Sequence, residues 1–271
     1  MVRGDSHLDT PRSPLKRAGK AVIYPIGLRA FDAALYVGER SRQYWEHYRY
    51  PRERMFFAPH CVDNDWFAVR ATAEARARLR AQHGIGAAAP VALFSGKLLA
   101  FKRPLDVIEA ASLCRASGQP IEVMVAGSGA LEGDMRRRAA ELGVPLHMLG
   151  FCNQTEMPPA YAAADILVLP SNGEETWGLV SNEALACGRP VIVSHACGCA
   201  PDLAEDGTAG RVSRCGDVAS LAQAMQSLLE APPSSEAIAA KARRHSIGAA
   251  VDGIVAAVHS TAKSNRAQAT G

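Results

Sequence analysis

Apolar and polar positions follow two alternating patterns from about residue 90 onward. Short apolar, β-rich runs without polar alternation are each followed by a longer segment with apolar residues three or four positions apart. The first pattern is typical of strands buried on both faces, and the second is typical of helices. The predicted strands are 91–95, 121–126, 146–149, 166–169 and 190–193, and the predicted helices between them are 104–117, 131–142, 157–164 and 178–187.

This order of elements predicts an α/β fold class with a doubly wound parallel sheet. Strands that are joined by helices lie parallel and side by side, and their connections are right-handed. In such sheets ligands bind beyond the carboxyl ends of the strands. We therefore expect the functional residues in the loops that follow the predicted strands.

The segments on either side of this unit are less regular. Residues 1–66 hold too few elements for a complete domain, and residues 84–90 are expected to form a linker. A turn at 207–211 is predicted to lead into a short strand, and residues 264–271 are predicted to be a frayed tail. In the N-terminal segment we expect a strand at 33–37, a helix at 41–50 and an apolar run at 55–59; the other predicted helices are 67–83, 218–230, 235–245 and 248–261. The predicted domains are 1–66, 67–246 and 247–271.

Composition narrows the range of partners. The 271 residues are 48% hydrophobic, which is enough for one large core or two smaller ones. A net charge of +3 is too small to indicate a nucleic-acid binder. Residues 1–60 carry eleven Arg and Lys against six Asp and Glu, so this end has either a solvated basic surface or an acidic partner such as an anionic membrane. The sequence has no apolar run of 18 residues and no signal pattern, so we expect a cytoplasmic protein. Peripheral association with the inner face of the membrane stays open as an alternative.

The seven cysteines do not form a disulfide pattern, because their number is odd and they fall mostly within apolar runs. We expect reduced core thiols. His195, Cys197 and Cys199 have metal-ligand chemistry, but no second ligand pair lies at zinc spacing. The sequence therefore predicts no metal site.

Glu175 and Glu183 flank the predicted start of a helix at Gly178. One carboxylate lies in the loop and the other within the helix, so both can face one cleft with the first helical amides. Such a site suits a ligand that is both phosphorylated and rich in hydroxyl groups. A pair of carboxylates is also found in hydrolases, but neither residue lies in an apolar loop that would keep it protonated. The alternative is that Glu175 caps the helix and Glu183 lies on its polar face.

Two lysines and a glycine-rich loop follow the first two predicted strands. Lys97 and Lys102 can reach over the strand ends toward a diphosphate, although a pair of solvated loop lysines would look the same in sequence. Gly127 and Gly129 only superficially resemble a dinucleotide fingerprint, because no acidic residue ends the next strand. These glycines either allow close approach of a ligand or form a tight turn.

Together these motifs resemble the nucleotide-sugar-binding half of retaining GT-B glycosyltransferases, and the family 4 type most closely. The resemblance covers residues 33–260 in order and spacing. It includes the Rossmann-like loops described above, the run Val168-Leu-Pro170-Ser171, and Gly188-Arg-Pro190 after the second glutamate. The family is built from two Rossmann-like domains that face each other across a cleft, and the C-terminal domain binds the donor.

The resemblance implies a role for each matching residue. Lys97 and Lys102 would neutralise the donor diphosphate, and Glu175 would hydrogen-bond the donor sugar. Glu183 would hold the ribose hydroxyls. The catalytic residues would be Lys97, Lys102 and Glu175. The expected donor-binding residues are Gly96, Gly127, Gly129, Phe151, Met157, Trp177, Gly178, Leu179 and Glu183.

The expected reaction transfers a sugar from a nucleotide-diphosphate sugar to an unidentified sugar or lipid-linked acceptor with retention of configuration. It uses no cofactor and no metal, because the lysines and the helix end stabilise the departing nucleoside diphosphate. Two alternatives stay open: a non-catalytic nucleotide-binding remnant, and a nucleotide-sugar epimerase of the same fold.

The sequence departs from the family pattern in two places. The first basic position is usually Arg and is Lys97 here, so a point charge replaces the planar, two-point contact that a guanidinium makes with a phosphate. Arg103 is the alternative source of that contact. Residues 2–6 and 36–41 resemble the last strands of the acceptor-binding domain. About the first hundred residues of a typical member are then expected to be absent, leaving 1–66 as a remnant of that domain.

Overall fold

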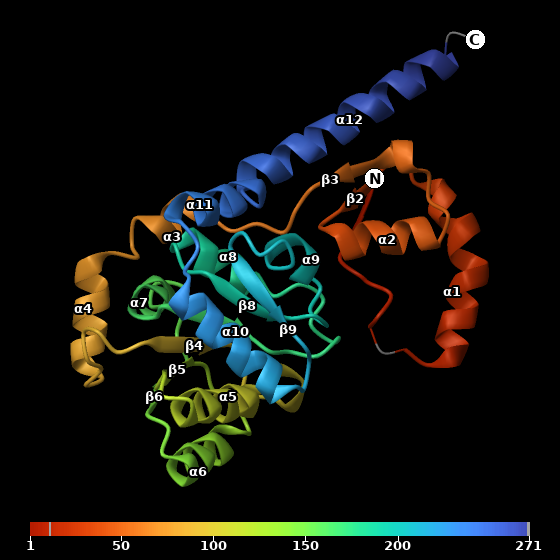
Figure 1. Cartoon of the computed structure of the whole chain (residues 1–271). Helices are drawn as coiled ribbons and strands as arrows, with labels where there is room; N and C mark the ends of the chain where they lie inside the picture. The colour runs from red at the N-terminus through yellow and green to blue at the C-terminus, as the bar shows by residue number, and fades with distance from the viewer. Residues whose placement is uncertain (11, 270–271) are drawn as a thin grey trace.

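Six parallel strands form the larger of two sheets in the computed structural model, which describes residues 1–10 and 12–269 (Figure 1). The strand order is β6-β5-β4-β7-β8-β9, so the chain leaves β4 in one direction and later returns to its other side at β7. This order places a topological switch point between β4 and β7. The strands are β4 (Val91–Ser95), β5 (Glu122–Ala126), β6 (Leu146–Gly150), β7 (Ile166–Leu169), β8 (Val191–Ser194) and β9 (Gly210–Ser213).

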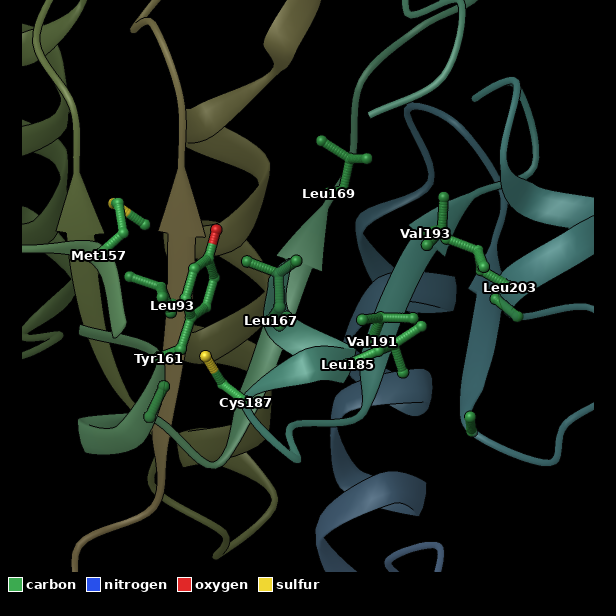
Figure 2. Packing of buried hydrophobic residues seen from close by; sticks show 14 of the residues in the cluster. Leu93, Met157, Tyr161, Leu167, Leu169, Leu185, Cys187, Val191, Val193 and Leu203 are labelled. Atoms are coloured by element: carbon green, nitrogen blue, oxygen red, sulfur yellow. The ribbon is translucent and has the colours of Figure 1, made fainter. Parts of the chain in front are cut away.

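Helices cover both faces of this sheet, as the lack of polar alternation in the strands predicts. One face packs against α5, α6 and α10 and buries side chains such as Ile108 and Met225. The other packs against α7 and α8, and there Tyr161 lies between Leu93 and Leu167, with its hydroxyl pointing toward the carboxyl ends of the strands (Figure 2). The helices are α4 (Ala73–Gln82), α5 (Pro104–Ala116), α6 (Glu132–Leu142), α7 (Met157–Ala163), α8 (Leu179–Ala186), α9 (Ala200–Leu203), α10 (Val218–Glu230) and α11 (Ser235–Arg244).

Three further parallel strands form a second, smaller sheet at the N-terminal end of the chain. Its order is β1-β2-β3, with strands β1 (Val2–Gly4), β2 (Ala34–Tyr36) and β3 (Met55–Phe57). Helices α1 (Pro14–Gly27) and α2 (Glu39–His47) make the connections between the strands. On one face, Tyr44 and Trp45 of α2 form an aromatic cluster with Tyr48, which follows the helix. The α/β class and the parallel sheet are therefore confirmed, whereas the predicted division into three domains stays a prediction.

Helix α12 (Ile247–Ala269) crosses back from the larger sheet to the other face of the smaller one (Figure 1). Ala257 is fully buried there with Ala33 and Ala58. At Gly253 a Cβ would lie 1.8 Å from the carbonyl oxygen of Phe57, so only glycine allows this approach.

Several predicted elements differ from the structure. The predicted helix 67–83 is two helices, α3 (Asn64–Ala68) and α4, because the Thr72 side chain accepts a hydrogen bond from the Ala75 amide and starts α4 anew. The aromatic-rich helix begins at Glu39 and ends at His47 rather than spanning 41–50. Helix α1 was not predicted, because Pro25 interrupts its pattern. The prediction of a frayed tail from residue 264 was wrong as far as Ala269, because α12 continues to that residue. Residues 270–271 lie outside the described residues.

Candidate functional site

A cavity of about 640 Å³ opens at the carboxyl edge of the larger sheet, next to the switch point. Backbone from the loops after β4 and β5 forms one wall, and α7 and α8 contribute side chains to the other. Parallel sheets of this order bind ligands at this location. Of the predicted site residues, the cavity is lined by Gly96, Lys97, Gly127, Phe151, Met157 and Glu183.

The glycines of this wall allow the two loops to approach each other. A Cβ on Gly127 would lie 1.9 Å from the carbonyl oxygen of Gly96, and a Cβ on Gly129 would lie 2.7 Å from that of Leu98. The Gly96 amide donates to the Ala126 carbonyl at 3.0 Å, which fixes the pairing. Close approach of one loop to another accounts for both glycines. Gly129 itself does not line the cavity.

Lys102 and Glu175 form an ion pair, although 73 residues separate them in sequence. Strand adjacency explains the contact, because Lys102 follows β4 and Glu175 follows β7, and these strands are neighbours. Both side chains are largely buried, with 17% and 13% of their surface exposed. The Ser171 hydroxyl also donates to Glu175 Oε2 at 3.2 Å. Each charge thus neutralises the other at the strand ends.

Both lysines adjoin Gly96, but they are placed differently. The Lys102 Cε lies 4.0 Å from the position that a Gly96 Cβ would take. Lys97 is exposed and lines the cavity directly. The structure therefore brings an exposed ammonium group and an ion-paired one to the same loop, where both can approach an anion.

Helix α8 begins beside the ion pair with its amino end at Gly178. The Glu175 Cγ lies 3.7 Å from the position that a Gly178 Cβ would take, and Gly178 has φ 100°. A Cβ here would also lie 2.4 Å from Leu169 Cδ2. The first amides of a helix have no partner within it and favour anions. Leu179 is 42% exposed at this end.

Trp177 does not line the cavity; it is only 4% exposed. Its indole Nε1 donates to Asn182 Oδ1 at 2.8 Å, and the Asn182 amide donates to the His60 carbonyl at 3.1 Å. These bonds join the start of α8 to the segment after β3. A contribution of Trp177 to donor binding would therefore act through the position of Gly178.

Glu183 faces the cavity from the second turn of α8 and is held by Tyr161 of α7. The Tyr161 hydroxyl donates to Glu183 Oε2 at 2.6 Å. Burial raises the pKa of Glu183 above its usual range, and the hydrogen bond from Tyr161 opposes that rise. The bond leaves the other carboxylate oxygen available to a ligand hydroxyl. Phe151 and Met157 lie at the β6 side of the cavity, where Phe151 is 77% exposed and Met157 is buried.

Part of the cavity wall comes from residues that the sequence analysis did not single out. Cys61, Val62 and Asp63 line it from the segment that follows β3, so the N-terminal part of the chain contributes directly. Asp63 could have been recognised in the sequence as a helix N-cap residue. Its side chain accepts a hydrogen bond from the Trp66 amide at 2.9 Å at the start of α3. The sequence analysis also missed Tyr161, because its hydrogen-bond partner, Glu183, lies 22 residues away in the sequence.

The cysteine and histidine cluster contacts backbone and side-chain groups of the protein. Cys197 Sγ lies 3.4 Å from the Ser171 carbonyl oxygen, and His195 Nδ1 accepts the Cys215 amide at 3.0 Å. Among residues 1–10 and 12–269, no group of three or more His, Cys, Asp or Glu side chains is arranged to hold a metal ion. Within the same residues, no helix combines the length and hydropathy needed to cross a bilayer.

Comparison with known proteins gives the family. The family model described as Glycosyl transferases group 1 matches residues 75–245. The chain belongs to this family. The matched residues include the loops after β4 and β5 and the helices α7 and α8, which line the cavity.

Two curated relatives show how much of a group 1 enzyme the chain spans. It is 32% identical over 241 residues to a D-inositol 3-phosphate glycosyltransferase of Geodermatophilus obscurus, covering 83% of this chain and 51% of the relative. It is 28% identical over 249 residues to a GDP-mannose-dependent alpha-(1-6)-phosphatidylinositol monomannoside mannosyltransferase of Mycolicibacterium smegmatis, covering 89% and 62%. The chain spans about half to two thirds of the length of these relatives.

Solved structures share the fold. Anabaena HepE in complex with UDP aligns with a TM-score of 0.77 at 21% identity, covering 94% of this chain and 71% of that one. The C-terminal domain of a group 1 glycosyltransferase, LpcC from Francisella tularensis, aligns with a TM-score of 0.54 at 22% identity, covering 67% of this chain and 92% of that domain. The larger sheet therefore has the architecture of a GT-B glycosyltransferase.

Proposed function

We propose that this chain is the donor-binding part of a retaining glycosyltransferase of the family 4 type. It would transfer a hexosyl group from a nucleotide-diphosphate sugar to a sugar or lipid-linked acceptor. The observation that carries this proposal is the meeting of Lys102, Glu175 and the start of α8 next to Gly96, which lines the cavity together with Lys97 and Glu183. The GDP-mannose-dependent relative and the solved structure of HepE in complex with UDP support this donor class.

The placement suggests a distribution of roles. Lys97 and Lys102 would bind the diphosphate together with the α8 amides around Gly178 and Leu179, and Glu183 would accept hydrogen bonds from the ribose hydroxyls. The base would lie near Phe151 and Met157. When the bond between the sugar C1 and the phosphate oxygen breaks, the negative charge that develops on the diphosphate would be stabilised by these cations and amides.

Glu175 would act on the donor sugar. Its carboxylate accepts from Lys102 and Ser171, which hold it in position for hydrogen bonding to a sugar hydroxyl. A diphosphate that enters would compete for Lys102 and release one carboxylate oxygen toward the sugar. The protein's own cations and amides would stabilise the developing charge, without a resident cofactor or metal.

The acceptor and the cellular place are part of the same proposal. The Mycolicibacterium smegmatis relative is a phosphatidylinositol monomannoside mannosyltransferase, which suits an acceptor carried by a lipid. The chain would then work in the cytoplasm at the inner face of the membrane, with the basic N-terminal segment toward the lipid.

Calorimetric titration with UDP and with GDP tests the donor site. We expect at least one of them to bind, and we expect Lys102→Gln to weaken that binding by about tenfold or more, since a charge-assisted contact contributes roughly 1.5–3 kcal/mol. Glu175→Gln should reduce transfer more than it reduces binding of the nucleotide alone. Lys16→Gln is the matched control, because this exposed lysine lies outside the cavity. Failure of both nucleotides to bind at millimolar concentration would contradict the proposal.

A further inference from the structure

Three arginines surround a single carboxylate at the amino-terminal edge of the larger sheet, the edge opposite the cavity proposed to bind the donor. The carboxylate belongs to Asp165, which directly precedes β7. Its Oδ1 accepts from Arg76 Nη2 at 2.7 Å, and its Oδ2 accepts from Arg80 Nη2 at 3.0 Å. The Val91 amide also donates to Oδ2, at 2.8 Å. Both oxygens are therefore occupied without any contribution from Arg189, the third arginine.

Arg76 and Arg80 are held by the protein itself. Arg76 Nη1 donates to the Ala164 carbonyl at 2.9 Å, and Arg80 Nε donates to the Ala163 carbonyl at 2.8 Å. These carbonyls lie at the carboxyl end of α7, which carries partial negative charge. The helix end and Asp165 together account for the positions of these two side chains.

Arg189 is half-buried and has no comparable partner. Its Nε and Nη1 donate to the carbonyls of Cys187 and Ala164 at 3.3 and 3.4 Å, which are long distances for hydrogen bonds. In the part of the chain that the structure describes, no carboxylate oxygen lies within 4.0 Å of its guanidinium group. Burial lowers the pKa of Arg189, and the charge of Arg76 lowers it further. Because a buried charge is costly unless it is paired, Arg189 favours an anion from outside the chain.

A hollow of about 390 Å³ opens beside Arg189, and we call it the amino-edge hollow. It is lined by Pro90, Asp165 and Pro190, which directly precede β4, β7 and β8. Arg76 and Arg189 contribute two cations to it. A volume of this size fits a small organic molecule better than a bare ion. The end of α10 and the start of α11 give the hollow an apolar part: Leu228, Leu229, Pro232 and Ile238.

Helix α11 begins at the amino-edge hollow, where Ser235 lines it. The Ser234 hydroxyl accepts the Ala237 amide at 3.2 Å, whereas the amides of Ser235 and Glu236 donate to no group within residues 1–10 and 12–269. Free amides in the first turn of a helix favour an anion. The Glu236 carboxylate is paired with Arg243 at 2.6 Å and does not line the hollow.

We infer that the amino-edge hollow binds a small organic phosphate monoester through Arg189, Arg76 and the start of α11. A guanidinium group can donate two parallel hydrogen bonds to a phosphate, and the apolar lining would contact the organic part of the ligand. Three guanidinium groups and one carboxylate carry a formal charge of +2, which suits a phosphate dianion better than a single carboxylate. The hollow shares no lining residue with the cavity proposed for the donor, so the inference is independent of the proposed transfer reaction.

Titration calorimetry with phenyl phosphate and with inorganic phosphate tests the site. We expect both to bind saturably, and phenyl phosphate about threefold tighter or more, because its ring reaches the apolar lining. Arg189→Gln should weaken the binding of phenyl phosphate about tenfold or more. Arg189→Lys keeps the charge without the planar group and should weaken binding less. Lys102→Gln changes the proposed donor cavity and should leave this binding within about twofold, which separates the two sites.

Arg211→Gln is the matched control. Arg211 is also half-buried, donates to the carbonyls of Gly207 and Gly210 at 2.7 and 2.8 Å, and does not line the hollow. Its replacement should leave the binding of phenyl phosphate within about twofold. Ser235→Asp is a second test that keeps Arg189 in place. Its carboxylate would repel the ligand, so binding should fall about tenfold or more, while an acidic residue in the first turn of α11 is compatible with the helix.

Far-ultraviolet circular dichroism shows whether each variant is folded. The inference fails if neither phosphate binds saturably at millimolar concentration, or if Ser235→Asp and a folded Arg189→Gln bind phenyl phosphate as Arg211→Gln does. It fails equally if Lys102→Gln abolishes the binding, because the ligand would then occupy the other cavity. Equal affinities for the two phosphates would overturn the assignment of an organic ligand. Binding of hexaglutamate that depends on Arg189 and exceeds that of phenyl phosphate would identify an acidic peptide instead.

Discussion

The Tyr161 hydroxyl donates to Glu183 Oε2 at 2.6 Å and so connects the buried face of α7 to the carboxylate that faces the cavity. Tyr161→Phe removes this bond and leaves Glu183 partly buried with one partner fewer. We expect the pKa of Glu183 to rise further, because the hydrogen bond opposes the effect of burial. Nucleoside diphosphate binding at neutral pH should weaken about threefold to tenfold, measured by calorimetry, and the free energy of unfolding should fall by about 1–3 kcal/mol.

Tyr50→Phe is the matched control for that change. Its hydroxyl donates to the Phe31 carbonyl at 2.8 Å in the connections of the smaller sheet, and neither residue lines the cavity. It should reduce stability without altering the affinity for the nucleotide. Equal nucleotide affinities for Tyr161→Phe and the unchanged chain would show that Tyr161 does not position Glu183 for the ligand.

Gly127 is a position where adding one methyl group should unfold the cavity wall. The Cβ of Gly127→Ala would lie 1.9 Å from the Gly96 carbonyl oxygen, and φ at this position is 156°. We expect the free energy of unfolding in urea to fall by more than about 2 kcal/mol, with loss of nucleotide binding.

Gly133→Ala supplies the comparison in the same connection. Gly133 lies within α6 and no atom lies within 4 Å of its added Cβ, so the change should leave stability equal or raise it by about 0.5–1 kcal/mol. Similar stabilities for the two alanine variants would mean that the two loops can separate without cost.

His245 should make the folded state less stable in mild acid. It is 2% exposed, and burial lowers its pKa to about 4, with Arg244 and Lys241 adding charge repulsion. Because the folded pKa is below the unfolded value of about 6.5, stability is lost as pH falls from about 6.5 toward 4. His245→Gln should flatten this fall, measured as the free energy of unfolding in urea between pH 7 and pH 4.5.

Asp202 should change the pH dependence of stability in the direction opposite to that of His245. Burial raises its pKa to about 6, although its carboxylate accepts the Glu39 amide at 3.0 Å. Because the folded pKa is above the unfolded value, its contribution is present below about pH 4 and is lost as pH rises through 6. Asp202→Asn should therefore steepen the loss of stability in acid that His245→Gln flattens. Parallel changes in the two variants would contradict the assignment of either group.

The sequence predicted the larger sheet well because its signals are local. Strands such as Val91–Ser95 and Val191–Ser194 are fully buried apolar runs, each followed by a helix, and this pattern is typical of strands covered on both faces. The ends of the elements differ by one or two residues, as hydrogen bonding at element ends decides them. The site was predicted in outline, since the loops after β4, β5 and β7 had to meet at one edge.

Contacts between distant residues were beyond the sequence. The pairing of Lys102 with Glu175 depends on β4 lying beside β7, which no local pattern states. The family resemblance placed Trp177 among the donor-binding residues, yet the indole packs inward on His60, with ring centroids 5.5 Å apart. Helix α1 depends on aromatic packing against Tyr44 and Tyr48, which outweighs Pro25 in its sequence.

The return of α12 to the smaller sheet has a consequence for the order in which the chain can fold. Ala33 and Ala58, which adjoin β2 and β3, are covered by Ala257, which lies about two hundred residues after the second of them, and Gly253 lies directly on the Phe57 backbone. During synthesis from the amino end, the first three strands emerge early with one face uncovered. They can reach their final packing only when residue 257 has emerged from the ribosome, so a nascent chain stalled before residue 250 should leave this face open to chaperones.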